Sequence, residues 1–435
     1  MQLRAVRTGL CYCLFLIAGA AQAGDPQISG LTERVSIENI RAHIDSLCYA
    51  GGHHSRITYT AGNYAAAEYI ASYFESLPGI THVQRDTFYL KVTAPPYDGY
   101  PLINIIATLE GNSGDHGVYI LGGHYDDSAS RQSNYSSLWN LREAQGADDN
   151  ATGMAAVMEI ARILSDPENN FRNRYTIRFI AFAAEESHPK QSGYSHLGSQ
   201  YDALRIKQQN IPLAGVLVLD MIGYNTLTDY IEIISNTAST WFADSAFSCS
   251  AEYVPGLIVN DPPFPDVPYS DHQSYQDEGY PAILMMENDS PWNDQLPLYS
   301  ANPNYHTTND LPATLNYSQT EKVTKAALST MASLTIDEPA GGISPGPVVP
   351  SGVWLQAYPN PFNARIRIAF SISRAGFVEA GIYDLNGRIV YDVCRGKMAA
   401  GTYSFVWETN LASGTYILRV RGEDILLTKK LICLK

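Results

Sequence analysis

The sequence reads Val118-Tyr119-Ile120-Leu121-Gly122-Gly123-His124-Tyr125-Asp126-Asp127 at its most informative point: an apolar run, two glycines, then an imidazole and two carboxylates. The apolar run predicts a buried strand, and the glycines let the backbone turn closely after it. In α/β proteins, ligands bind just beyond the carboxyl ends of such strands. His124 is therefore a candidate metal ligand, and Asp126 is placed to accept its other ring N–H and fix its tautomer. Taken alone, the stretch fits an ordinary hydrogen-bonded loop histidine better, so the assignment depends on the rest of the chain.

Two further apolar runs also end in acidic residues. Tyr175–Ala184 ends in Glu185-Glu186, and the run that follows it along the chain ends in Asp220. Near-continuous apolar content is typical of buried parallel strands. Adjacent carboxylates at such a strand end repel each other unless something positive lies between them. Three successive strands thus carry His124, Glu186 and Asp220 at their carboxyl ends, which a site at one edge of a sheet requires.

Two more segments supply candidate ligands. Gly146-Ala147-Asp148-Asp149-Asn150-Ala151-Thr152-Gly153 leads into Met154–Leu164, which is apolar enough to predict a helix buried on most sides. Helix capping explains one acidic residue there, but not two in a row. His306 precedes another expected helix at about 317–334, and on its own it fits a capping or core histidine.

The remaining periodicities complete an α/β domain with a mixed, mostly parallel central sheet flanked by helices. Ser270 is expected to cap a helix that begins near Asp271-His272. Helices are expected at 36–48, 60–77 and 240–252 and around 197–201, and strands at 83–92, 102–109, 230–234 and 281–286.

His124, Asp149, Glu186, Asp220 and His306 together are two imidazoles and three carboxylates. That set suits two zinc ions that share one bridging carboxylate. Two such metals can hold a hydroxide and polarise a carbonyl oxygen. Glu185 is then left to act as a general base on the water and to return the proton to a leaving amine.

Five motifs, in this order, resemble the co-catalytic di-zinc aminopeptidase family, which includes bacterial leucyl aminopeptidases and, more distantly, glutaminyl cyclases. The resemblance covers about residues 36–335 and implies the zinc exopeptidase fold. The motifs are Gly122–Asp127, Gly146–Gly153, Ala183–Glu186, Leu219–Tyr224 and Tyr305–Asp310.

The resemblance also implies a role for each site residue. His124 and Asp220 would bind one zinc, Glu186 and His306 the other, and Asp149 would bridge both, with a cis peptide bond to Asn150. Glu185 would be the general base that takes a proton from a metal-bound water to give hydroxide. Asp126 would orient His124, and Tyr305 matches a tyrosine that stabilises the tetrahedral intermediate in some members. Asp271-His272 resembles a family stretch that does not bind zinc.

The implied function is a secreted zinc-dependent aminopeptidase that hydrolyses N-terminal residues from peptides or proteins. Ser187–His196 is longer than the corresponding link of typical aminopeptidases and is faintly similar to that of glutaminyl cyclases. A cyclase-like acyltransferase with a single zinc and a non-catalytic binding relative are therefore alternatives. The formal charge of −15 argues against nonspecific nucleic-acid binding.

The chain is expected to divide into a signal peptide (1–23), a zinc exopeptidase domain (24–336), a Pro/Gly linker (337–352) and a small all-β, immunoglobulin-like sandwich (353–435). Two arginines, an apolar run and Ala21-Gln22-Ala23 predict the signal peptide and its cleavage site. The apolar run is too short to span a membrane, so the mature protein is expected to be secreted or at the cell surface without stable membrane insertion.

The sandwich resembles the type IX secretion C-terminal sorting domain, which implies outer-membrane secretion machinery as a partner. An immunoglobulin-like spacer without a sorting role is the alternative. The motifs are Tyr358–Asn363, Ile382–Arg388, Ser413–Tyr416 and Lys429–Leu431.

Four cysteines lie outside the signal peptide, namely Cys48, Cys249, Cys394 and Cys433. Secretion would place them in an oxidising compartment, and their even number permits pairing. Cys394 with Cys433 is the favoured pair, since both belong to the small domain. No Cys-x-x-Cys occurs, so no cysteine-based zinc or redox site is expected.

Overall fold

The computed structural model describes residues 25–90, 99–112, 117–186, 195–260, 267–288, 298–337, 355–358, 365–372, 374, 376–398, 401–408, 412–422 and 425–433. The predicted signal peptide and residues 338–352 of the predicted linker lie outside these ranges. So do residues 187–194 of the extended loop and 359–363 of the first sorting motif.

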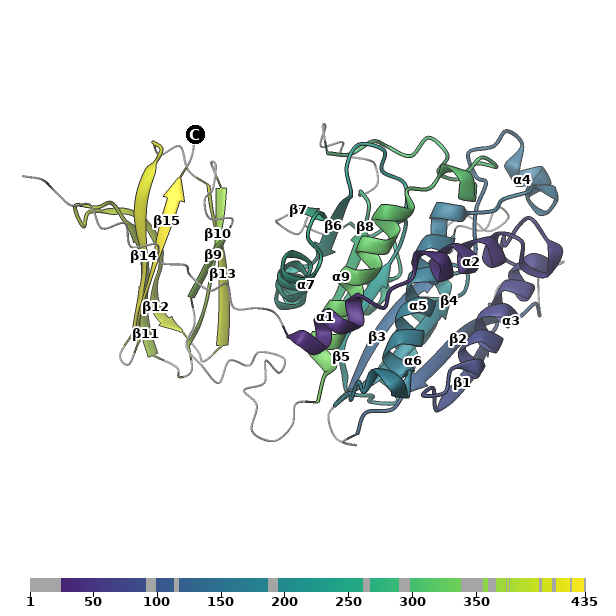
Figure 1. Ribbon diagram of the computed structural model, residues 1–435, viewed down its shortest axis with the longest axis horizontal. Coiled ribbons are helices and arrows are strands. Elements are labelled where there is room, and N and C mark those ends of the chain that lie inside the picture. Colours follow the sequence, from purple (N-terminus) through teal and green to yellow (C-terminus); the bar gives the residue numbers. More distant parts are fainter. Residues whose placement is uncertain are drawn as a thin grey trace, which may run out of the picture.

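An eight-stranded mixed sheet forms the centre of the N-terminal domain (Figure 1), in the order β1-β2-β4-β3-β5-β8-β6-β7. The pairs β4–β3, β3–β5, β5–β8 and β6–β7 are parallel, and the other three are antiparallel. The strands are β1 His82–Phe88, β2 Leu102–Leu109, β3 Val118–His124, β4 Thr176–Phe182, β5 Leu213–Leu219, β6 Tyr230–Ser235, β7 Ile258–Asn260 and β8 Ala282–Met286.

Helices cover both faces of this sheet because its central strands are apolar on both sides. One face packs against α2, α3, α5, α7 and α9, and the other against α6 and α8. Alternate residues divide between the faces: Leu121 faces the first group and Ile120 the second. The helices are α1 Pro26–Thr32, α2 Ile37–Cys48, α3 Ala61–Ser76, α4 Tyr135–Leu138, α5 Gly153–Ser165, α6 Leu197–Gln208, α7 Thr240–Tyr253, α8 His272–Asp277 and α9 Tyr317–Thr335.

The predicted mixed, mostly parallel sheet flanked by helices is therefore confirmed. The strands expected to carry the site, β4, β3 and β5, are direct neighbours in the middle of the sheet. Because they run parallel, their carboxyl ends lie at the same edge. Every one of the seven residues of β3 is buried, as expected for a central parallel strand.

Some short elements differ from the prediction. Helix α1 was not expected; Asp25 caps it by accepting the Gln27 N–H at 2.7 Å, and a proline begins it. Strand β7 is only three residues long, too short for an alternation signal. The predicted N-cap role of Ser270 is wrong, because α8 begins at His272 after Asp271 and the Ser270 hydroxyl bonds elsewhere.

The C-terminal region is an all-β sandwich, as predicted. A three-stranded sheet, β13-β10-β9, packs against a four-stranded antiparallel sheet, β12-β11-β14-β15, through one apolar core that includes Ile368, Phe370, Ile382 and Leu418. The strands are β9 Leu355–Tyr358, β10 Arg365–Ile372, β11 Gly376–Tyr383, β12 Ile389–Met398, β13 Gly401–Glu408, β14 Gly414–Arg421 and β15 Leu426–Cys433.

The favoured disulfide between Cys394 and Cys433 is wrong. All four described cysteines are free thiols. Cys394 lies on β12 and Cys433 on β15, which are the two opposite edges of the four-stranded sheet, so β11 and β14 separate them.

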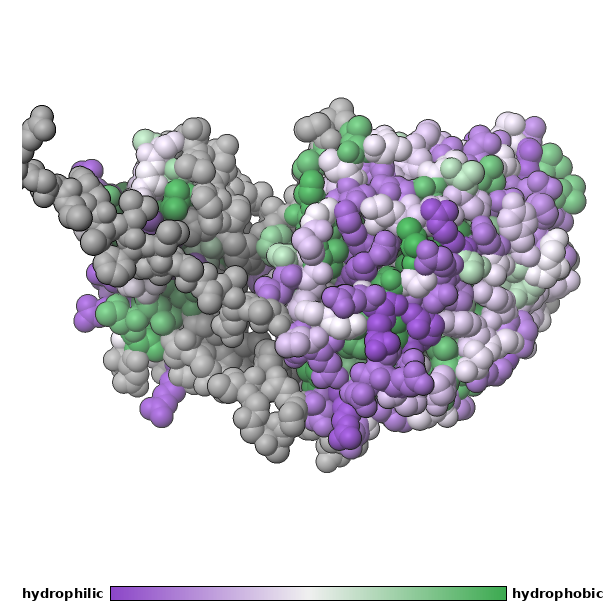
Figure 2. Space-filling model, in the orientation of Figure 1, coloured by the Kyte–Doolittle hydropathy of each residue, from purple (hydrophilic) through white to green (hydrophobic). Residues whose placement is uncertain are grey.

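The surface of the N-terminal domain is mostly hydrophilic on the face shown in Figure 2, with hydrophobic side chains in small separate groups. Among the described residues, no helix is both long and apolar enough to cross a membrane.

Candidate metal centre

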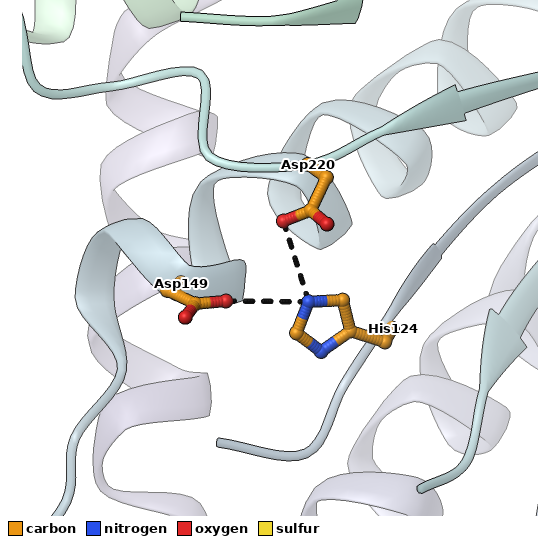
Figure 3. Close-up of side chains that lie close together, drawn as sticks. All are labelled: His124, Asp149 and Asp220. Carbon is orange, nitrogen blue, oxygen red and sulfur yellow. Dashed lines mark hydrogen bonds and ion pairs between the residues drawn. The ribbon is translucent and has the colours of Figure 1, made fainter. Parts of the chain in front are cut away.

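Two groups of possible metal ligands lie at the carboxyl edge of the central strands. The first joins His124, Asp149 and Asp220 (Figure 3). His124 Nε2 lies 3.3 Å from Asp149 Oδ1 and 3.3 Å from Asp220 Oδ1. His124 is the last residue of β3 and Asp220 follows β5 directly, so two neighbouring strands present them side by side.

The second group joins Asp149, Glu186 and His306, so Asp149 belongs to both. His306 Nε2 lies 3.1 Å from Asp149 Oδ2 and 2.7 Å from Glu186 Oε1. Despite that short distance, Glu186 Oε1 is buried and accepts no hydrogen bond. The ligand atoms of each group lie within 4.8 Å of one another, which is close enough for one cation to bind between them.

The charge balance of these groups also fits a cation. In the described part of the chain, no ion pair joins Asp149, Glu186 or Asp220 to a lysine or arginine. Burial raises the pKa of the Glu186 and Asp220 carboxyls above the usual range. Burial lowers the pKa of the His306 imidazole, but the charges and hydrogen bonds of Glu186 and Asp149 together outweigh it and raise that pKa to about 10. Three carboxyl groups thus share the site with only two imidazoles, and a cation bound among them would offset the cost of burying their charge.

An irregular turn before α5 positions Asp149. This residue has non-helical dihedral angles, and its peptide bond to Asn150 is cis, as the family resemblance implies. The Asp310 carboxylate accepts the Asp148 N–H at 2.9 Å and the Asp149 N–H at 3.0 Å. The Asp148 carboxylate points elsewhere and accepts the Gly223 N–H. Of the two adjacent acidic residues that helix capping did not explain, Asp149 therefore faces the metal-ligand groups and Asp148 stabilises the loop.

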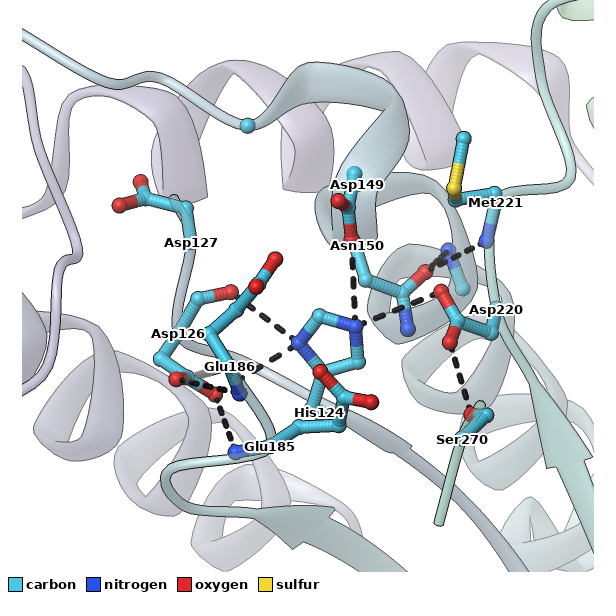
Figure 4. A network of polar contacts seen from close by, with 12 residues as sticks. His124, Asp126, Asp127, Asp149, Asn150, Glu185, Glu186, Asp220, Met221 and Ser270 are labelled. Carbon is cyan, nitrogen blue, oxygen red and sulfur yellow. Dashed lines mark hydrogen bonds and ion pairs between the residues drawn. The ribbon is translucent and has the colours of Figure 1, made fainter. Parts of the chain in front are cut away.

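Asp126 connects His124 to the Glu185-Glu186 segment (Figure 4). The His124 Nδ1 atom lies 3.2 Å from the Asp126 carbonyl oxygen and 3.5 Å from its carboxylate, so the hydrogen bond goes to the main chain. The carboxylate accepts the N–H groups of Glu185 at 3.0 Å and Glu186 at 3.3 Å, and the Thr58 hydroxyl at 2.9 Å. Asp126 therefore fixes the backbone that carries two of the predicted site residues.

Several polar contacts escaped the sequence analysis. The Ser270 hydroxyl donates to Asp220 Oδ2 at 2.7 Å, and Ser130 Oγ lies 2.8 Å from His306 Nδ1. His196 Nε2 lies 3.0 Å from Glu185 Oε1. Serine and histidine in loops carry no periodic signal, so only the folded structure reveals these contacts.

Tyr305 lies against the second ligand group. Its ring stacks on that of His306, with centroids 3.7 Å apart, and the Arg131 guanidinium carbon lies over the Tyr305 ring, 4.6 Å from its centroid. Burial and the nearby carboxylates raise the pKa of the Tyr305 hydroxyl well above its usual range. The phenol therefore stays protonated and able to donate a hydrogen bond.

Comparison with protein-family models gives two matches. Residues 104–331, just over half of the chain, match peptidase family M28. Residues 356–434 match a secretion system C-terminal sorting domain. The first match contains all five residues of the two ligand groups.

Individual proteins agree with the family matches. A probable zinc metalloprotease of Pyrenophora teres f. teres is 32% identical over 212 residues, covering 47% of this chain and 41% of that protein. The chain thus matches less than half the length of that relative. The Legionella pneumophila LapA aminopeptidase has a TM-score of 0.55 at 19% identity, covering 70% of this chain and 73% of that one. Porphyromonas gingivalis glutaminyl cyclase has a TM-score of 0.55 at 20% identity, covering 68% and 98%.

The similarity to these two solved structures shows the fold, and the match to the family model shows the family. The chain belongs to peptidase family M28 and carries a C-terminal secretion sorting domain.

Proposed function

We propose that this protein is a secreted, zinc-dependent aminopeptidase that binds two zinc ions and removes N-terminal residues from peptides. The observation that carries the proposal is that two ligand groups share one carboxylate, Asp149. His124 and Asp220 would hold one zinc, and Glu186 and His306 the other. Two imidazoles and three carboxylates are a donor set that zinc accepts.

Zinc ions bound there would supply a Lewis acid for the scissile carbonyl group and would lower the pKa of water. Glu185 lies beside the ligand Glu186 and belongs to neither group, so its carboxylate is available to take a proton from water. The same carboxylate would return that proton to the leaving amine. Tyr305, protonated and adjacent to His306, would donate a hydrogen bond to the oxygen on which negative charge develops.

The presence of two ligand groups rather than one favours a peptidase over a cyclase with a single zinc. Asp149, Glu186 and His306 alone would suffice for one metal, yet His124 and Asp220 form a further buried set around the same Asp149. A cyclisation that needs one zinc gives no reason for these two ligands. The family membership leaves the substrate open, so the choice depends on experiment.

Export is part of the proposal. We propose residues 1–23 as a signal peptide and the C-terminal domain as the element that outer-membrane secretion machinery recognises. The match of residues 356–434 to a sorting domain supports the second part. The proposed boundaries are 24–336 for the peptidase domain and 353–435 for the sorting domain, joined by residues 337–352.

Metal content of the purified mature protein, measured alongside hydrolysis of a panel of aminoacyl anilides, tests the proposal. Two zinc ions per chain and chelator-sensitive hydrolysis are expected, and the panel identifies the preferred side chain. One zinc per chain, with cyclisation of N-terminal glutamine and no hydrolysis, would identify a cyclase. A protein that binds no metal would be a non-catalytic relative.

A further inference from the structure

His196 contacts Glu185 through both its main chain and its side chain. The His196 N–H donates to the Glu185 carbonyl oxygen at 2.8 Å. The ring Nε2 lies 3.0 Å from Glu185 Oε1. Of the charged side chains in the described part of the chain, only His196 forms an ion pair with Glu185.

The backbone around His196 is firmly placed. The N–H groups of Leu197 and Gly198 donate to the carbonyl oxygens of Ala184 and Ala183, both at 2.9 Å, so the start of α6 lies along the end of β4. A Cβ atom at Gly198 would lie 2.4 Å from Asn104 Oδ1 and 2.5 Å from the Ala183 carbonyl oxygen, so this close approach requires glycine. The His196 ring is therefore held beside Glu185 by the fold.

The backbone conformation of His196 itself is unusual. Its φ is +54°, in the left-handed region that residues other than glycine seldom adopt. The Ser199 hydroxyl and the Gln200 N–H both donate to its carbonyl oxygen, at 3.1 and 3.0 Å, and stabilise the turn. Backbone strain of this kind clusters at functional sites.

The electrostatics are consistent with a charged hydrogen bond. Burial lowers the pKa of His196, but the charge and hydrogen bond of Glu185 outweigh it and raise that pKa to about 9. The imidazole therefore keeps both N–H groups near neutral pH and donates one of them to the carboxylate. A charge-assisted bond of this type restricts the carboxylate more than a neutral one would.

We propose that His196 is a positioning residue for Glu185, holding Oε1 so that Oε2 is the oxygen that takes the proton from water. The inference rests on the proposed role of Glu185 as general base. His196 itself contacts neither ligand group through any described bond, so it acts through Glu185. Removing a hydrogen-bond partner of a metal ligand typically costs 10- to 100-fold in affinity or activity, and we expect a loss of the same order for a partner of Glu185.

Kinetics of zinc-loaded variants give the first test. His196→Leu should lower kcat by about 10- to 100-fold, with KM within about twofold and two zinc ions retained. His196→Gln, which keeps an N–H donor at nearly the same reach, should recover much of the loss. His82→Gln, on the exposed end of β1, is the control for removing a histidine. A rise in KM at unchanged kcat would overturn the proposal.

A double-mutant cycle separates a positioning role from a general structural one. If His196 acts only through Glu185, then adding His196→Leu to Glu185→Gln should lower kcat no further. An equal loss in both backgrounds would mean that His196 supports the fold rather than the base. Thermal unfolding of each variant identifies any that fail to fold.

A spectroscopic test needs no activity and leaves His196 unchanged. In zinc-loaded protein labelled with ¹⁵N-histidine, the Nε2 signal of His196, assigned by its loss in His196→Gln, should shift in Glu185→Gln. If wild-type protein hydrolyses nothing, the proposed function fails, yet this shift still shows the contact. An unshifted signal overturns the inference whatever the activity.

Discussion

The Ser270 hydroxyl donates a hydrogen bond to Asp220 Oδ2 at 2.7 Å, across 50 residues of sequence and with both side chains buried. The other carboxylate oxygen, Oδ1, faces His124. Ser270 thus fixes the rotation of the Asp220 carboxylate and presents one defined oxygen to the first ligand group. Hydrogen bonds to metal ligands usually contribute to metal affinity because they orient the ligand before the metal arrives.

Ser270→Ala should lower the binding affinity for one of the two zinc ions by roughly 10- to 100-fold, because Asp220 belongs to one ligand group only. Titration against a zinc chelator would measure the two affinities separately. Ser248→Ala, which removes an exposed helical hydroxyl, is the control. Two unchanged zinc affinities in Ser270→Ala would show that the hydrogen bond does not prepare the ligand.

Glu185→Ala should lower kcat by about 10²- to 10⁴-fold while zinc content stays near two per chain. A general base contributes about 10²- to 10⁴-fold, and Glu185 lies in neither ligand group. Single-substrate kinetics and elemental analysis of the same sample make the comparison. Glu75→Ala, an exposed residue paired with Arg85, should retain full activity. Full activity in Glu185→Ala would rule out this base.

Asp149→Asn should remove both zinc ions, whereas Asp220→Asn should retain one. The physical reason is that Asp149 alone contributes to both groups. An amide is a weak ligand, and because it is neutral it cannot reduce the repulsion between two neighbouring cations. Zinc content after dialysis against buffer measures the difference. Equal losses in the two variants would contradict a shared carboxylate.

The ends of three strands made much of this site predictable. His124, Glu186 and Asp220 follow apolar runs that the sequence identifies as buried, and β4, β3 and β5 prove to be parallel neighbours. Topology then brings their carboxyl ends together, without any need to know side-chain positions. Asp149 and His306 were harder to predict as ligands, because helix capping could explain each of them and only the family motifs identified them.

Contacts made by loops were not predictable in the same way. His196 meets Glu185 because α6 begins against the end of β4, which depends on Gly198 and Asn104 rather than on periodicity. Ser270 appeared to be a helix cap, since a cap and a buried hydroxyl donor look alike in sequence. The predicted Cys394–Cys433 disulfide was wrong because two residues that share a domain need not lie on adjacent strands.

His43, far from the site, gives a prediction about stability. It lies on α2, buried, with Nδ1 2.9 Å from the Tyr69 hydroxyl. Burial, aided by the charge of Arg162, lowers its pKa from 6.5 to about 4. The unfolded chain therefore binds more protons than the folded one between these values, and the free energy of unfolding falls as the pH drops through that range.

His43→Gln should therefore remove part of the acid sensitivity of the fold. Between pH 7 and pH 5, the wild type should lose about 2 kcal/mol of stability through this imidazole alone, and the variant should lose that much less. Urea unfolding at both pH values measures the difference, and the intact metal site contributes equally to both proteins. His53→Gln, which removes an exposed histidine instead, is the control. The same pH dependence in His43→Gln and wild type would mean that His43 has the same pKa in the folded and the unfolded protein.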